Sequence, residues 1–196
     1  MIPAIDRPVI LASASPRRAS LLRQVGVAFQ VHPPRFEEPT AQHVSETAGT
    51  AATELAIRKV QAIAENHPRA LIIGADTVVA LQNRLLGKPA DDREAKRMLR
   101  ALSGHTHNVI TGVALLLQPE ASLHTFTAET IVRFRSLTDE EIARYVQTGE
   151  SRDKAGAYGI QGKGALLVQL IRGDYNNVVG FPLTAFYVQL RKQHII

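Results

Sequence analysis

The sequence predicts a mixed α/β (α+β) fold, in which helices pack around a sheet. Apolar runs of strand length alternate with stretches of helical periodicity along the whole chain. The hydrophobic fraction of 45% and the charged fraction of 21% are ordinary for a globular protein that buries a sizeable core. No linker is long enough to divide the chain, so residues 1–196 are expected to form a single domain.

The first half of the chain is expected to contain a strand at 9–14, a helix at 16–26, a strand at 27–31, a helix at 47–66 and a strand at 70–81. The strands are short apolar runs. The first helix has Pro16 in its first turn and ends at Gly26, and the second repeats apolar residues at helical spacing. Gly74 and Asp76 interrupt the strand at 70–81, which is the most hydrophobic of the three.

The second half is expected to contain a helix at 91–102, strands at 107–117 and 124–137, a helix at 138–150, a strand at 165–171 and a helix from Leu183 onward. Asp91 opens the first of these helices and Gly104 ends it. Thr138 and Glu141 have the spacing of a capping box. Glycines, prolines and polar residues predict loops at 82–92, 151–164 and 172–182.

Charge and cysteine content narrow the possible functions. The formal net charge of +5 favours an anionic ligand, such as a phosphate compound or a nucleic acid. The chain has no cysteine, which excludes a disulfide, a thiolate zinc site and a thiol nucleophile. Neither a signal peptide nor an apolar run of membrane-spanning length is found, so a cytoplasmic protein without a membrane partner is expected.

The first candidate site follows the strand at 9–14. Ser13, Ser15, Arg17 and Arg18 stand where this strand ends and a helix begins. A helix N-terminus presents free backbone N–H groups, and hydroxyl and guanidinium donors suit phosphate oxygens. The pattern predicts an anion-binding site. In the alternative interpretation, Ser15 only caps the helix and the arginines are solvated.

Acidic residues mark the second candidate site. Asp76 lies within an apolar strand, where a carboxylate is costly unless it is paired, binds a metal or faces a cleft. Glu37 and Glu38 form an acidic pair that could ligate a divalent cation, although a solvated loop would show the same pattern.

Two glycine-containing segments complete the candidates. Lys88 stands between Gly87 and Pro89, but the segment lacks the other residues of a Walker A motif and could be a solvated turn. The glycine-rich segment at 151–164 could approach a base closely and read it through the Gln161 amide, or it could be a flexible loop.

The ordered set of motifs resembles the Maf family of nucleoside triphosphate pyrophosphatases over nearly the whole chain. The motifs are "SASPRR", "GADT", "GKP", "MLRALSGHTHNVITGVAL", "DKAGAYGIQGKG" and "GDYNNVVGFPL". The glycine-loop sequence and "GDYNNVVG" resemble the branch that hydrolyses dTTP and UTP. The resemblance implies a long twisted mixed sheet with a cleft between two lobes, as in the inosine triphosphatase fold. It also implies homodimers and a divalent metal, Mg²⁺ or Mn²⁺.

The resemblance also implies site residues. Asp76 matches the family's proton acceptor, and Arg17, Thr77 and Gln161 match its specificity positions. The remaining matches are a metal-binding glutamate at Glu37 (with Glu38 adjacent) and phosphate-side lysines at Lys88 and Lys59.

Together these residues imply a mechanism. Ser13, Ser15, Arg17, Arg18 and Lys88 would hold the triphosphate, and Glu37 and Asp76 would hold the cation. Water activated by Asp76 would attack the α-phosphorus and release pyrophosphate and the nucleoside monophosphate. The alternative is a non-catalytic regulator of cell division that binds a nucleotide or nucleic acid. The acidic residues favour the enzyme, and no basic, aromatic-rich stripe for nucleic acid is seen.

Overall fold

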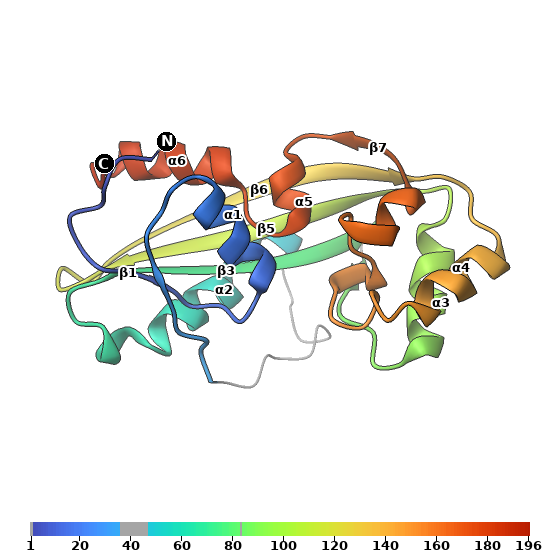
Figure 1. Ribbon diagram of the computed structural model, residues 1–196, viewed down its shortest axis with the longest axis horizontal. Coiled ribbons are helices and arrows are strands. Elements are labelled where there is room, and N and C mark those ends of the chain that lie inside the picture. The colour runs from blue at the N-terminus through green and yellow to red at the C-terminus, as the bar shows by residue number, and fades with distance from the viewer. Residues whose placement is uncertain (1, 36–46, 83) are drawn as a thin grey trace.

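One mixed sheet organises the protein, as a computed structural model shows for residues 2–35, 47–82 and 84–196 (Figure 1). The strand order is β2-β1-β3-β5-β6-β7, with β4 paired to β3. The strands are β1 (Val9–Leu11), β2 (Gln30–Val31), β3 (Leu71–Leu81), β4 (Arg84–Leu86), β5 (Thr106–Leu117), β6 (Ser122–Phe134) and β7 (Val168–Arg172). β1 is parallel to β2 and β3, whereas the other pairs are antiparallel, so the expected mixed sheet is confirmed.

The helices gather at the two ends of the sheet. They are α1 (Pro16–Gln24), α2 (Ala48–Gln61), α3 (Asp92–Leu102), α4 (Asp139–Gln147), α5 (Tyr175–Val179) and α6 (Leu183–Lys192), with 3-10 helices η2 (Ala64–Asn66), η3 (Ala155–Ala157) and η4 (Gly162–Leu167). α2 is the longest at 14 residues, and no helix of the described chain combines the length and apolarity that a membrane crossing requires.

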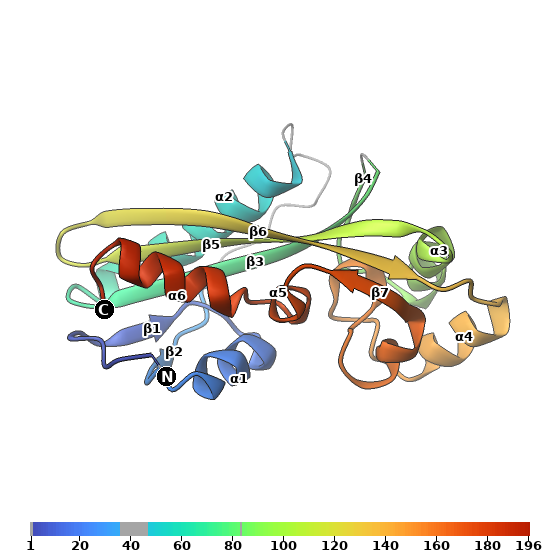
Figure 2. The same cartoon turned by 90° about the horizontal axis from the view of Figure 1, so that it is seen from above.

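The long antiparallel strands β3, β5 and β6 extend through both ends of the molecule (Figures 1 and 2). At one end, the first lobe, α1 and α6 pack on one face of the sheet and α2 packs on the other. At the other end, the second lobe, α3, α4, η3 and η4 enclose a separate apolar cluster around Phe134. Since β3 and β5 contribute residues to the cores of both lobes, the sheet itself fixes their relative position.

Two glycines let α2 lie directly on the sheet. A Cβ added to Gly74 of β3 would stand 2.5 Å from the carbonyl oxygen of Ala56, and one added to Gly112 of β5 would stand 2.4 Å from the backbone of Ala52. Real Cβ atoms do not approach so closely, so both positions require glycine at this helix–sheet spacing. The small side chains of Ala52 and Ala56, both fully buried, complete the close contact.

The predicted elements are confirmed where the periodicity is long, and the errors concern short segments. The loop predicted at 82–92 contains β4, and the loop predicted at 172–182 contains α5. Of the strand predicted at 27–31, only Gln30–Val31 pairs with a neighbour. These elements are too short to show a period, so their structure depends on the neighbours that they pair with or pack against.

Candidate active site

The site begins at a gap along one edge of β3. β5 pairs with β3 over residues 71–80 and therefore occupies its other edge. On the near edge, β1 pairs with residues 71–73 and β4 pairs with residues 79–81. Among the described residues, no strand pairs with residues 74–78 on this edge. Asp76 lies in the middle of the gap, and residues 76–78 are partly exposed, whereas residues 71–75 are buried.

Asp76 forms an ion pair with Lys59 of α2. The Lys59 Nζ donates to Asp76 Oδ1 at 2.5 Å, and the two side chains are only 8% and 14% exposed. The pair depends on the close approach of α2 to Gly74 and Gly112, because this approach brings the lysine within reach of the strand. The structure thus brings together Lys59 and Asp76, which are 17 positions apart in the sequence and belong to different predicted elements.

The end of β1 leads into α1, as the sequence predicts. The Ala12 amide still bonds to Ile73 of β3, and the chain then leaves the sheet at Ser13. Ser15 is the N-cap of α1, with its Oγ accepting from the Arg18 amide, and the Ser15 amide donates to the Ser13 Oγ at 3.2 Å. The predicted cap is therefore confirmed, and it places the N-terminus of α1 next to the gap in β3.

Arg18 occupies a more buried position than a cleft-facing phosphate ligand would. Its Nε donates to the Gly180 carbonyl at 2.9 Å, its Nη1 to the Ser13 Oγ at 3.2 Å and its Nη2 to the Thr77 Oγ1 at 3.1 Å. The guanidinium thus joins α1, β3 and the segment between α5 and α6. Arg18 is therefore not solvated, as the alternative interpretation of the segment would have it, and its role as a phosphate ligand stays a prediction.

The hydroxyl of Thr77 belongs to the same buried network. Thr77 Oγ1 lies 2.9 Å from Thr111 Oγ1 of β5, its direct partner in the sheet register. Successive residues of a strand point to opposite faces, so Thr77 faces Arg18 while Asp76 faces α2. The two adjacent residues of the GADT motif therefore serve different sides of the sheet.

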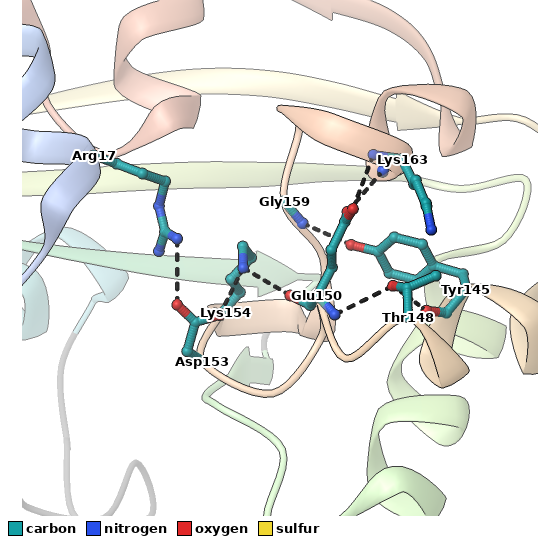
Figure 3. A network of polar contacts seen from close by, with 9 residues as sticks. Arg17, Tyr145, Thr148, Glu150, Asp153, Lys154, Gly159 and Lys163 are labelled. Atoms are coloured by element: carbon teal, nitrogen blue, oxygen red, sulfur yellow. Dashed lines mark hydrogen bonds and ion pairs between the residues drawn. The ribbon is translucent and has the colours of Figure 1, made fainter.

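Arg17 points away from this network toward the second lobe. Its Nη1 donates to the Asp153 Oδ2 at 3.3 Å, and Figure 3 shows the two side chains facing each other from α1 and from the segment before η3. Lys154 donates to the other oxygen of Asp153 at 2.6 Å and to the Glu150 carbonyl at 2.7 Å. Arg17 and Asp153 connect the two lobes beside the gap.

The glycine-rich segment is held by α4 and by Glu150. The Glu150 carboxylate accepts from the amides of Lys163 and Gly164, and the Tyr145 Oη accepts from the Gly159 amide (Figure 3). Burial raises the pKa of Tyr145 to about 12, so the phenol remains neutral. Gln161 stands exposed at the N-cap of η4, within the segment that the sequence predicts as a loop.

The remaining predicted residues lie at the margin or outside the described structure. Lys88 is exposed just after β4. Glu37 and Glu38 lie outside the residues that the structure describes. Among the residues that it does describe, no group of three or more His, Asp or Glu side chains could hold a metal ion.

Sequence reasoning missed Asp153, Glu150 and Thr111. They reach the candidate site residues and the glycine-rich segment only through contacts between distant segments, which no local pattern reports. An acidic residue directly before a lysine in the glycine-rich segment was the one available signal for Asp153.

Fold and site together define a mixed α/β protein in which a largely buried carboxylate, paired with a lysine, lies in the unpaired stretch of a strand, and the neighbouring strand β1 leads into a basic helix N-terminus. Residues 8–193 match the family described as Maf-like protein, and the chain belongs to this family.

Its relatives include three bacterial proteins, each named dTTP/UTP pyrophosphatase. The Moorella thermoacetica protein is 50% identical over 89% of both chains. The Dictyoglomus turgidum protein is 49% identical over 90% of this chain and 91% of its own. The Bacillus cereus protein is 45% identical over 96% of this chain and 97% of its own.

Proposed function

We propose that this protein hydrolyses dTTP and UTP to the nucleoside monophosphate and pyrophosphate. The observation that carries the proposal is the 45–50% identity, over nearly the full length, with proteins named dTTP/UTP pyrophosphatase. The position of Asp76 in the gap of β3, the strand that pairs with β1 just before α1 begins, supports it. A nucleotide bound at this edge of β3 would meet the backbone amides of α1 on one side of the sheet and the Asp76 carboxylate on the other.

On this proposal, the chain divides the work among three groups of residues. The phosphate oxygens are bound by Ser13, Ser15, Arg17, Arg18 and Lys88, with Lys59 as a further phosphate-side lysine. Ser13 and Arg18 also hold the start of α1 in place through their contact with each other and the bond of Arg18 to Gly180. Asp76 takes a proton from the attacking water, and Lys59 orients the Asp76 carboxylate through its bond to Oδ1. Gln161 and Thr77 contribute to the choice of base.

The Asp76 carboxylate has the chemistry of a ligand for a divalent cation. Asp76 binds Lys59 through Oδ1, and a carboxylate has a second oxygen that a hard cation can share. We propose that Asp76 and Glu37 (or the adjacent Glu38) hold Mg²⁺ or Mn²⁺. When bound, the cation would neutralise phosphate charge in the transition state.

The oligomeric state and the cellular location are also proposals. We expect a homodimer, as the resemblance to the family implies, and we expect the protein to act in the cytoplasm, where its nucleotide substrates occur. Size-exclusion chromatography with light scattering tests the dimer.

A panel of nucleotides tests the function. The purified protein is incubated with dTTP, UTP, CTP, dATP and GTP, with Mg²⁺ or Mn²⁺, and release of pyrophosphate and of monophosphate is measured. We expect dTTP and UTP to be the best substrates. Binding of nucleotide without any pyrophosphate release would instead support the non-catalytic regulator.

A further inference from the structure

We propose that Asp153 is a positioning residue that holds Arg17 between the two lobes, so that Arg17 meets the triphosphate in one orientation. This inference rests on the proposed function. Arg17 belongs to α1 in the first lobe, and Asp153 belongs to the second lobe, where it precedes the glycine-rich segment. Their contact therefore joins the helix that receives the phosphates to the segment that carries Gln161 (Figure 3).

The geometry favours orientation of Arg17 over its occlusion. Asp153 binds a single terminal nitrogen, Nη1, at 3.3 Å. A guanidinium has five N–H donors in a planar fork, so its other edge can still bind phosphate oxygens. Arginine has a long side chain that loses rotamer freedom when it binds an anion. A contact that restricts the side chain beforehand reduces this loss when the nucleotide arrives.

The charges around Asp153 also favour this role. Lys154 Nζ lies 2.6 Å from Oδ1, and its side chain is itself bound to the Glu150 carbonyl. Partial burial raises the pKa of Asp153, but the bonds and charges of Lys154 and Arg17 outweigh this effect and lower it. One carboxylate thus stands between two cations, and the group presents a net positive charge to an incoming triphosphate.

Gly159 lies against the Lys154 side chain that binds Asp153. A Cβ at Gly159 would stand 2.5 Å from the Cε of Lys154, so a side chain here would displace the end of the lysine from its present position. Because Lys154 binds the Asp153 carboxylate, the missing side chain at Gly159 helps to keep that contact.

Kinetics of Asp153 variants test the inference. We expect Asp153→Ala to raise KM for dTTP about fivefold with a smaller change in kcat, the size of a favourable exposed ion pair. Asp153→Asn keeps an oxygen that accepts from Arg17, and should show a smaller rise. The matched control is Asp92→Asn, which removes an ion pair between Arg152 of the same segment and α3, and should leave KM unchanged. Since the Asp153 side chain is 63% exposed, the variants should melt at the wild-type temperature.

A double-mutant cycle decides whether Asp153 acts through Arg17. In an Arg17→Ala background, Asp153→Ala should have no further effect on KM beyond about twofold. Fully additive effects would overturn the inference, and so would a fall in KM in Asp153→Ala, which would mean that the carboxylate competes with the phosphates.

The same cycle on the Kd of a non-hydrolysable α,β-imido analogue of dTTP separates this inference from the proposed function. A wild-type protein that binds the analogue but releases no pyrophosphate from dTTP refutes only the function. Coupling of the two substitutions in Kd would then sustain the role of Asp153, and additivity would refute it.

Discussion

At the scale of single residues, the chemistry depends on the neighbours that the fold gives to Asp76 and Arg18. Both are charged residues in apolar surroundings, and each is satisfied in a different way. Asp76 bonds Lys59 on the side of the sheet that α2 covers, whereas Arg18 donates to oxygens of Ser13, of Thr77 in β3 and of Gly180 after α5. A buried charge with such partners stabilises one arrangement of the site, because any displacement would leave it unsatisfied.

The first prediction concerns the proposed base. Asp76→Asn keeps the shape of the side chain but removes its basicity and one metal ligand. We expect kcat for dTTP to fall by about 10²–10⁴. Far-ultraviolet circular dichroism should remain that of the wild type. Activity within about threefold of wild type under saturating metal would contradict the role of Asp76 as the base.

The second prediction concerns the exposed Gln161. Its amide can both donate to and accept from the edge of a uracil or thymine ring, whereas the exocyclic amine of cytosine reverses part of that pattern. Gln161→Ala should reduce the preference for dTTP over CTP, measured as the ratio of kcat/KM values, by about 1–3 kcal/mol. If all nucleotides lose activity alike, Gln161 only supports the segment held by Glu150.

How far the sequence predicts the site can be judged from these same residues. Asp76 could be predicted because a carboxylate in an apolar strand violates a local rule. Ser15 could be predicted because a hydroxyl directly before a helix satisfies one. The burial of Arg18 could not, because Arg17 and Arg18 are equivalent in the sequence. Which of two neighbouring arginines enters the core is decided by the rotation of α1 on the sheet.

At the scale of elements, the contact of α2 with the sheet places Lys59. Helix propensity and amphipathicity predict that α2 exists, but they do not predict how closely it approaches β3 and β5. That distance depends on the missing Cβ atoms of Gly74 and Gly112, which meet the backbone of α2. In the sequence alone, Gly74 is only an interruption of the strand, since its effect on packing appears only once the helix is placed.

The third prediction tests this contact. Gly112→Ala should destabilise the protein by about 1–3 kcal/mol, because the new methyl group would overlap the α2 backbone at 2.4 Å. It should also lower kcat, since a displaced α2 moves Lys59 away from Asp76. The matched control is Gly49→Ala, at the start of α2, where the nearest atom would be at 3.7 Å.

Urea denaturation of both variants makes the comparison. Alanine has the higher helix propensity, so Gly49→Ala should be neutral or stabilising. Equal destabilisation by the two substitutions would mean that close packing of α2 is not what Gly112 provides.

The fourth prediction concerns His107, which lies in the second lobe between Phe134 and Tyr158. Its Nε2 is 2.8 Å from the Tyr158 Oη, and burial lowers its pKa to about 4. The unfolded chain, with a pKa near 6.5, binds a proton that the folded protein does not. Stability should therefore be full above about pH 6.5 and fall as the pH decreases toward 4, by up to about 3 kcal/mol.

A pH series of unfolding free energies for wild type and His107→Leu isolates this effect. The variant has its own loss of stability, because Tyr158 loses its partner, but this loss is the same at every pH. The part of the slope between pH 6.5 and 4 that belongs to His107 should disappear. An unchanged slope would show that other groups account for the acid sensitivity.

At the scale of the whole molecule, one set of strands serves both lobes. β3 contributes Ile73 to the core beneath α1 and Val79 to the core beneath α3, and Asp76 lies between the two. The alternation of strands and helices could predict the class of fold. It could not predict that a single strand passes through both cores, because strand order depends on contacts between distant segments. The gap that exposes Asp76 follows from that order.

The fifth prediction separates metal binding from folding. Both cores are apolar and extend along continuous strands, so their stability should not require a cation. A cation held by the proposed ligands, Asp76 and Glu37, is expected to serve catalysis and not folding. Treatment with EDTA should abolish pyrophosphate release, and Mg²⁺ or Mn²⁺ should restore it, while the melting temperature of the nucleotide-free protein stays within about 2 °C of its value without EDTA.

Mg²⁺ added with the α,β-imido analogue of dTTP should raise the melting temperature more than either does alone, because the cation and the triphosphate bind together. A large loss of melting temperature in EDTA alone would instead indicate a structural ion, and the carboxylates near the gap would then hold the fold as well as the substrate.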